Sequence, residues 1–202
     1  MQGVRKQDPA EKVGVVADVD GRMMVIEYSD LPAEHAARRA TDGTLELWAG
    51  SIAVHTFDAD FLLRMSAGDG QLPFHRARKK VPFVDASGKT IEPAEPNALK
   101  FEKFIFDLAP AARTAMVVEV DPAEAFAPLK NGPGAKTDSP EWVREQMIAQ
   151  ATRWLRQAGS TVTPGTPVEI SPLVGYDAET VAAAVKPGAK IEKPTYLRTA
   201  DW

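Results

Sequence analysis

The sequence has no cysteine among its 202 residues. This absence excludes disulfides, thiolate metal sites and a cysteine nucleophile, and it fits a reducing compartment. The three histidines, His35, His55 and His75, lack the spacing of metal ligands. Because no apolar run approaches the roughly 20 residues that span a bilayer, we expect a soluble, cytoplasmic protein.

An excess of positive charge is also lacking. The chain has 24 basic and 28 acidic residues, a formal charge of −4, and its one strongly basic stretch is HRARKK at 75–80. This balance disfavours nucleic acid and membrane surfaces as partners. No serine lies in a nucleophile-elbow pattern. With 44% apolar residues, the chain is typical of one globular domain or one lobe of a larger enzyme.

Residues 13–28 predict a β-hairpin. Two apolar segments flank Asp20-Gly21, a dipeptide favoured in two-residue turns because both positions need a positive φ. If Val19 pairs with Arg22, Gly14 lies opposite Glu27, and the glycine leaves space beside the carboxylate. Glu27 is then either a solvated strand end or a ligand contact, since glycine in a strand often marks the close approach of a ligand.

The rest of the chain predicts alternating helices and strands. A long helix starts at Ser139-Pro140-Glu141, which supplies an N-cap, a proline at the first helical position and an early acid, and it ends at Gly159. The residues after it alternate short strands, a short helix and proline-marked turns. Apolar periodicity predicts the other elements, namely helices at 30–40, 57–65 and 97–111 and strands at 47–56, 79–84 and 115–120.

Residues 97–131 carry an aromatic and a cation that suggest a sugar and a phosphate. On the predicted helix, Phe106 lies about 140° from Phe101, so it needs a second apolar layer or a ligand, whereas the periodicity places Phe104 in the core. Lys130 follows a strand and an acidic turn, where α/β sheets present charges to ligands. A loop lysine is otherwise a solvated side chain, and both interpretations stay open on pattern alone.

Five pieces of the chain, in order, resemble the C-terminal half of the UDP-N-acetylglucosamine pyrophosphorylases, within the UDP-sugar pyrophosphorylase family. The resemblance spans about residues 4–175. Its pieces are PAEKVGVVADVDGRMMVIEYSDL, GSIAVHTFDADFL, LPFHRARKKVPFVD, NALKFEKFIFD and FAPLKN. It implies an α/β fold, the C-terminal part of a Rossmann-like (GT-A-like) α/β/α sandwich with a mixed sheet. Residues 1–165 would belong to the catalytic domain and 166–202 to a small C-terminal subdomain.

The resemblance also implies a reaction, in which UTP and a sugar 1-phosphate give a UDP-sugar and pyrophosphate with Mg²⁺ as cofactor. Catalysis of such a transfer rests on positioning and on cations that neutralise charge. The Mg²⁺-binding aspartate, the glycine-rich phosphate loop and the uracil pocket of the family would precede this chain. The residues implied to act here are Gly14, Glu27, Ser51, Phe104 and Phe106 around the sugar, and Lys130 at a phosphate as the catalytic residue.

One departure leaves the sugar open. The chain has Gly50-Ser51-Ile52 where the family usually has an asparagine in a G-N-I piece, which favours glucose or broad sugar specificity as an alternative to N-acetylglucosamine. A non-catalytic sugar-nucleotide-binding module is the alternative from another class. Because the UTP-side residues of the family are absent, we expect the 202 residues alone to release no pyrophosphate. We also expect an exposed apolar sheet edge where the missing N-terminal half docks.

Overall fold

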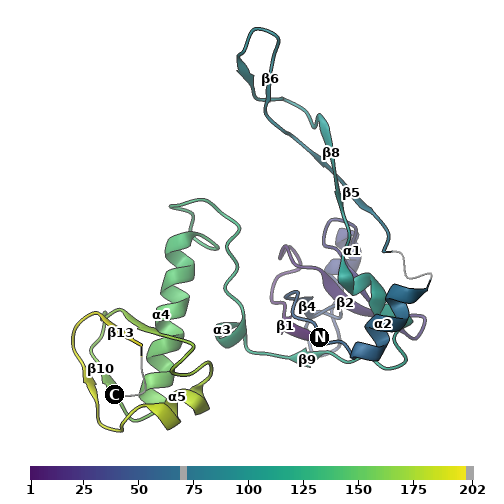
Figure 1. The fold of residues 1–202 in the computed structure, drawn as a ribbon. Coiled ribbons are helices and arrows are strands. Elements are labelled where there is room, and N and C mark those ends of the chain that lie inside the picture. The colour runs from purple at the N-terminus through teal and green to yellow at the C-terminus, as the bar shows by residue number, and fades with distance from the viewer. Residues whose placement is uncertain (69–71, 199–202) are drawn as a thin grey trace. The chain divides into compact units, whose positions relative to one another are not determined.

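The computed structural model describes residues 1–68 and 72–198. The chain, drawn in Figure 1, divides into two compact units, Met1–Val120 and Asp121–Trp202. Each unit has its own hydrophobic core. Both units combine helices with strands, and the largest sheet contains both parallel and antiparallel pairs. The predicted α/β class with a mixed sheet is therefore confirmed.

Unit 1 is built on a five-stranded sheet with the order β3-β2-β4-β1-β9. Within this sheet, the β1-β9 pair is parallel and the other strand pairs of the described residues are antiparallel. Two further two-stranded sheets, β5-β8 and β6-β7, lie along one extended segment (Figure 1). The elements are β1 (Gln2–Arg5), β2 (Val15–Val19), β3 (Arg22–Ile26), α1 (Ala33–Ala36), β4 (Ala49–Ser51), α2 (Ala59–Ala67), β5 (His75–Lys79), β6 (Phe83–Val84), β7 (Thr90–Ile91), β8 (Ala98–Glu102), the 3₁₀ helix η1 (Ile105–Ala111) and β9 (Val118–Glu119).

The predicted hairpin forms in the predicted register. Val19 pairs with Arg22, and the turn residues Asp20 and Gly21 have φ values of 52° and 76°. This left-handed backbone matches the strand twist, and aspartate and glycine are the residues that adopt it at low cost. The register therefore follows from local turn chemistry.

The predicted helix over 97–111 is wrong in its first half. Residues Ala98–Glu102 form β8, which pairs antiparallel with β5 along its whole length. The chain becomes helical only at Ile105, after Phe104 in extended conformation, and as a 3₁₀ helix with Pro110 inside it. Pairing with a strand about 20 residues upstream overrode the local apolar period, so the helical-wheel comparison of Phe106 with Phe101 does not apply.

Several other elements are shorter in the structure than the sequence pattern predicted. The helix expected at 30–40 is reduced to α1, because the turn after Glu27 occupies the residues before Pro32 and Arg39 forms an isolated bridge with Leu45. The strand expected at 79–84 is two strands separated by a segment that contains Pro82, which has no N–H to donate. The strands expected at 47–56 and 115–120 contract to β4 and β9. The helix expected at 57–65 is confirmed as α2, capped by Asp58.

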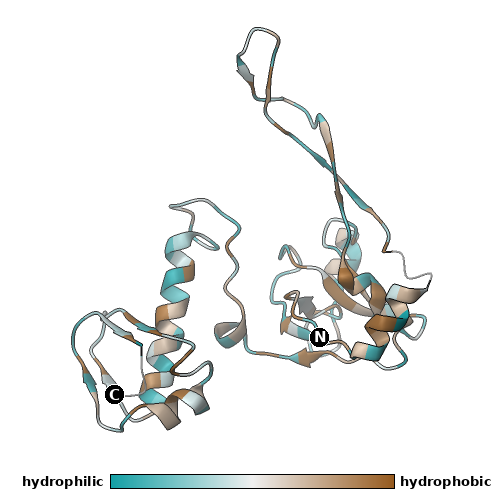
Figure 2. Cartoon of the chain, viewed as in Figure 1, coloured by the Kyte–Doolittle hydropathy of each residue, from teal (hydrophilic) through white to brown (hydrophobic). Residues whose placement is uncertain are grey.

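Unit 2 packs the long helix α4 (Pro140–Gln157) against the C-terminal residues. Ser139 caps α4 by accepting a hydrogen bond from the Trp142 N–H at 3.3 Å, and Gly159, with φ of 83°, follows the helix end, as predicted. Apolar and hydrophilic residues alternate along the helix (Figure 2). The other elements are α3 (Pro122–Ala125), β10 (Thr161–Val162), β11 (Val168–Ile170), α5 (Ala178–Ala184), β12 (Lys190–Ile191) and β13 (Thr195–Leu197).

The core of unit 2 joins α4 to the residues that follow it. Leu155 of α4, Val181 of α5 and Leu197 of β13 are all fully buried in one cluster, and the strand pairs β10-β12 and β11-β13 are both parallel. By contacts, the chain therefore divides after Val120. The division expected between residues 1–165 and 166–202 comes from the family resemblance, not from contacts, and stays a prediction. None of the helices in the described part of the chain has the length and apolar character of a bilayer span.

Candidate functional site

Gly14 and Glu27 lie in contact at the open end of the β2-β3 hairpin. A Cβ built on Gly14 would lie 2.8 Å from Glu27 Oε1 and 3.0 Å from Val25 Cγ1. Gly14 is buried and Glu27 is half-buried. The glycine therefore lets the carboxylate approach the backbone to a distance that any side chain at position 14 would prevent, and the predicted pairing is confirmed.

Ser51 at the end of β4 joins this pair. Its N–H donates to the Gly14 carbonyl at 2.7 Å, and the preceding residue, Gly50, pairs with Val15 of β2. The Ser51 side chain is half-buried. Gly14, directly before β2, therefore lies between Glu27, directly after β3, and Ser51 at the end of β4.

The two predicted aromatic residues belong to the same face of the sheet as this contact. Side chains alternate between the faces of a strand, so Gly14 and Glu27 share a face with Val16 and Val25, and Ser51 shares it with Ala49. The core cluster of unit 1 on this face consists of Val16, Val25, Ala49 and Phe106, with Phe104 packed against it. Five of the six predicted residues thus lie on one face of unit 1.

Phe104 and Phe106 have different environments from those that periodicity suggested. Their rings stack with centroids 4.8 Å apart and planes at 14°. Phe106 is 7% exposed and sits in the core, whereas Phe104 is half-buried. Of the two rings, that of Phe104 is the more accessible, and the buried ring of Phe106 stacks against it on the core side.

The structure places a histidine and an aspartate beside these rings that sequence reasoning missed. His75 of β5 forms a hydrogen bond from Nε2 to Asp107 Oδ2 at 2.8 Å, and its ring centroid lies 4.8 Å from that of Phe104. The two residues are 32 positions apart in the chain and meet because of the β5-β8 pairing. No local pattern in the sequence could have indicated this contact.

A pocket of unit 1 with a volume of about 510 Å³ lies near the aromatic pair. His55, Phe57, Phe61, Arg64 and Arg113 are among its lining residues. None of the six predicted residues lines it. The Gly14–Glu27 contact and this pocket are therefore separate features of unit 1.

His55 lines the pocket, and its ring lies beside that of Phe106 in the core. Its burial leads us to expect a stability that depends on pH. Burial lowers the pKa of His55, and its Nδ1 is buried without a hydrogen-bond partner among the described residues. The unfolded chain, with a histidine pKa of about 6.5, then binds a proton more readily than the folded one. We expect the free energy of unfolding to fall as the pH is lowered below about 6.5, measured by urea denaturation between pH 5 and 8. If His55→Asn retains the same slope, this assignment is wrong.

Lys130 lies in unit 2, in the loop between α3 and α4. The side chain is exposed, and the N–H groups of Lys130 and Asn131 both donate to the Asp138 carbonyl at 2.9 Å. The predicted site residues thus come from both units, five from unit 1 and Lys130 from unit 2. Within residues 1–68 and 72–198, no group of three or more His, Asp or Glu side chains is placed to hold a metal ion.

No family model matches the chain, but curated proteins do. The chain is 40% identical over 186 residues to the UDP-N-acetylglucosamine pyrophosphorylase of Saccharomyces cerevisiae, covering 90% of this chain and 39% of that protein. It is 38% identical over 213 residues to the human UDP-N-acetylhexosamine pyrophosphorylase-like protein 1, covering 96% of this chain and 42% of that protein. The chain therefore spans about two fifths of the length of these relatives.

A solved structure shows the same likeness. The crystal structure of an Entamoeba histolytica protein described as a UDP-N-acetylglucosamine pyrophosphorylase matches with a TM-score of 0.81 at 31% identity, covering 98% of this chain and 48% of that one. These comparisons confirm the resemblance that the five sequence pieces indicated.

Proposed function

We propose that this chain, a homologue of part of the UDP-N-acetylglucosamine pyrophosphorylases, provides the sugar-phosphate side of a uridylyltransferase. The reaction would join UTP and N-acetylglucosamine 1-phosphate to give UDP-N-acetylglucosamine and pyrophosphate. The observation that carries the proposal is the contact of Gly14 with Glu27, 2.8 Å from a Cβ position to Oε1, next to Ser51. Glycine in a strand often marks a close approach to the backbone, and here it lets a carboxylate that could bind sugar hydroxyls lie against the sheet.

Each predicted residue has a chemical role in this proposal. The Glu27 carboxylate would accept hydrogen bonds from sugar hydroxyls, which are stronger than neutral pairs because the acceptor is charged. The accessible ring of Phe104, stacked on the buried Phe106, would pack on the apolar face of the sugar or its acetamido methyl. Lys130 would contact a phosphate as a point charge.

The chemistry follows from the substrates. The sugar phosphate would attack the α-phosphorus of UTP in line, with pyrophosphate as the leaving group, and such transfers are accelerated by positioning and by neutralisation of charge. This chain would orient the attacking sugar phosphate. The Mg²⁺ implied by the family stays a prediction and no step is assigned to it, because the described residues include no cluster of three or more His, Asp or Glu side chains placed to hold a metal ion. We further propose that the mixed sheet of unit 1 is part of a GT-A-like sandwich.

The proposal predicts that Glu27→Gln weakens binding of N-acetylglucosamine 1-phosphate about tenfold to a hundredfold, since the charged acceptor is lost. Titration calorimetry on the chain measures this. Glu34→Gln changes an exposed acid on α1 and serves as the matched control, with unchanged affinity expected. If the Glu27 variant and the unchanged protein bind the sugar phosphate with equal affinity, the assignment of Glu27 as a sugar contact is wrong.

A broader sugar specificity is the second candidate, and Ser51 favours it. The serine has a shorter side chain than the family's usual asparagine and lies directly beside Gly14, to whose carbonyl its N–H donates. If Ser51 relaxes specificity, the affinities for glucose 1-phosphate and N-acetylglucosamine 1-phosphate should be within a factor of about three, and Ser51→Asn should shift the preference toward the acetamido sugar by about tenfold. A strong preference for the acetamido sugar in the unchanged protein would exclude this candidate.

A further inference from the structure

The short helix α3 in unit 2 has no buried residue. It is four residues long, and Asp121 caps it by accepting a hydrogen bond from the Ala123 N–H at 2.9 Å. Apolar burial is the usual means by which a helix is held on its neighbour. The position of α3 on α4 must therefore depend on polar contacts.

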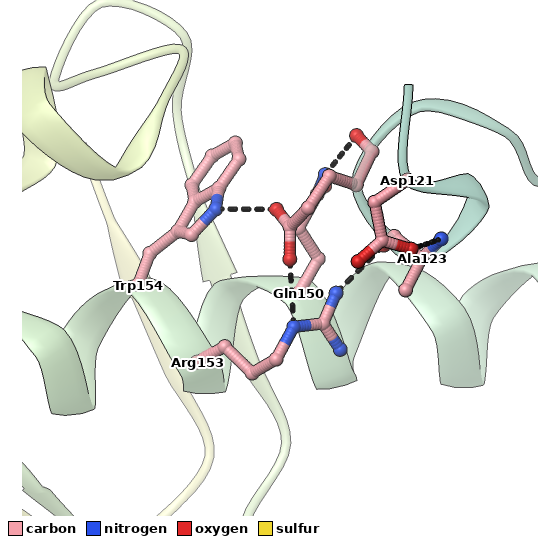
Figure 3. Close-up of polar contacts among 6 residues, drawn as sticks. Asp121, Ala123, Gln150, Arg153 and Trp154 are labelled. Carbon is pink, nitrogen blue, oxygen red and sulfur yellow. Dashed lines mark hydrogen bonds and ion pairs between the residues drawn. The ribbon is translucent and has the colours of Figure 1, made fainter. Parts of the chain in front are cut away.

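Those contacts converge on Glu124, and Figure 3 shows Gln150, Arg153 and Trp154 of α4 facing α3. The Glu124 carboxylate accepts from Arg153 Nε at 2.7 Å and from Trp154 Nε1 at 2.8 Å, one bond at each oxygen. Two backbone carbonyls of α3 are bound as well: Gln150 Nε2 donates to that of Glu124 and an Arg153 guanidinium nitrogen to that of Ala123, each at 2.6 Å. We call these residues, Ala123, Glu124, Gln150, Arg153 and Trp154, the Glu124 clasp.

The clasp anchors one end of the loop that carries Lys130. At the other end, the N–H groups of Lys130 and Asn131 donate to the Asp138 carbonyl. Asp138 directly precedes Ser139, which caps α4 and is 1% exposed. The loop is thus fixed to α4 at two places. One is the N-terminus of α4, and the other is near Arg153. Lys130 lies six positions after Glu124, a reach of at most about 20 Å, so the loss of the clasp contacts would leave the backbone of Lys130 without this anchor on its N-terminal side.

We propose that Glu124 is a positioning residue, which acts through the placement of Lys130 and does not touch the substrate. The inference rests on the proposed role of Lys130 at a phosphate. The Lys130 ammonium contributes most when it is held at a defined place, since a misplacement of about 1 Å can lower an enzymatic rate about a hundredfold. Both carboxylate oxygens of Glu124 are used, so an amide, with one acceptor oxygen, cannot replace it.

Hydrogen exchange of the 202-residue chain tests the structural part without any substrate. In Glu124→Gln, we expect the amides of Lys130 and Asn131 to exchange about tenfold faster, since their bonds to Asp138 open more often. Trp154→Phe removes one donor but keeps a ring, and should give a smaller increase. Glu145→Gln, at an exposed acid of α4 outside the clasp, should exchange as the unchanged protein does. Unchanged exchange in both clasp variants refutes the proposal.

Binding of N-acetylglucosamine 1-phosphate tests the functional part. Lys130→Ala and Glu124→Gln should each lower the affinity, the latter by about tenfold, and the double variant should be no weaker than Lys130→Ala alone, because the two residues act as one unit. If Lys130→Ala has no effect, the proposed function of Lys130 fails, while the exchange rates still decide whether the clasp holds the loop. A third outcome contradicts the positioning role: Glu124→Gln speeds the exchange of the loop amides but leaves the affinity unchanged, while Lys130→Ala lowers the affinity.

Discussion

Gly14→Ala is expected to lower the affinity for N-acetylglucosamine 1-phosphate by about a hundredfold. The added methyl would lie 2.8 Å from Glu27 Oε1, closer than real Cβ atoms approach, and 3.0 Å from Val25 Cγ1, which is a tight contact. Val25 is 8% exposed in the core and cannot move freely, so the Glu27 side chain must turn away. The same crowding should cost about 1–3 kcal/mol of stability. Calorimetric titration and urea denaturation measure the two effects.

Gly68→Ala is the matched control for this experiment. Gly68 has φ of −120°, and a Cβ there would meet the Arg64 carbonyl at 3.5 Å, an ordinary contact. Alanine should be accommodated there without loss of affinity. If Gly14→Ala binds the sugar phosphate as the unchanged protein does, the Gly14–Glu27 contact is a structural feature only.

Leu155→Ala is expected to destabilise unit 2 by about 2–5 kcal/mol, the cost of a leucine cavity in a core. Leu155 is fully buried in the cluster that joins α4 to α5 and β13. A domain of this size has a total stability of about 5–15 kcal/mol, so the loss is a large part of it. Urea denaturation followed by circular dichroism at the helical band reports the transition, since α4 is the longest helix in the described residues.

Met147→Ala provides the comparison on the same helix. Met147 is 59% exposed, so truncation should change the unfolding free energy by less than about 1 kcal/mol. If the two variants lose equal stability, α4 does not pack on the tail through Leu155. In that case the grouping of α4 with residues 161–197 would be wrong.

The features that were predictable from sequence are those set by a few neighbouring residues. The hairpin register follows from Asp20-Gly21, whose left-handed backbone admits only one pairing of the strands. The cap of α4 follows from Ser139, whose side-chain oxygen accepts a hydrogen bond from the Trp142 N–H in the first turn of the helix. The Gly14–Glu27 contact could be predicted because it is a direct consequence of that hairpin register.

The segment around Phe106 shows where this reasoning fails. Phe101 and its neighbours have an apolar period close to that of a helix, yet residues Ala98–Glu102 pair with His75–Lys79. Backbone hydrogen bonds to a strand distant in sequence outweigh a weak local preference. The same pairing brings His75 to Asp107 and Phe104, and neither contact has a local sequence signal.

By itself, the sequence determined the α/β class, the hairpin with its glycine and carboxylate, the long capped helix and the resemblance to UDP-N-acetylglucosamine pyrophosphorylases. These depend on backbone preferences and on ordered motifs within short stretches. Only the tertiary structure decided that Phe106 is buried beneath Phe104, that His75 supports this pair, and that Glu124 ties the Lys130 loop to α4. Those arrangements depend on contacts between residues far apart in the chain, whose loop-closure cost is offset only when the whole unit folds.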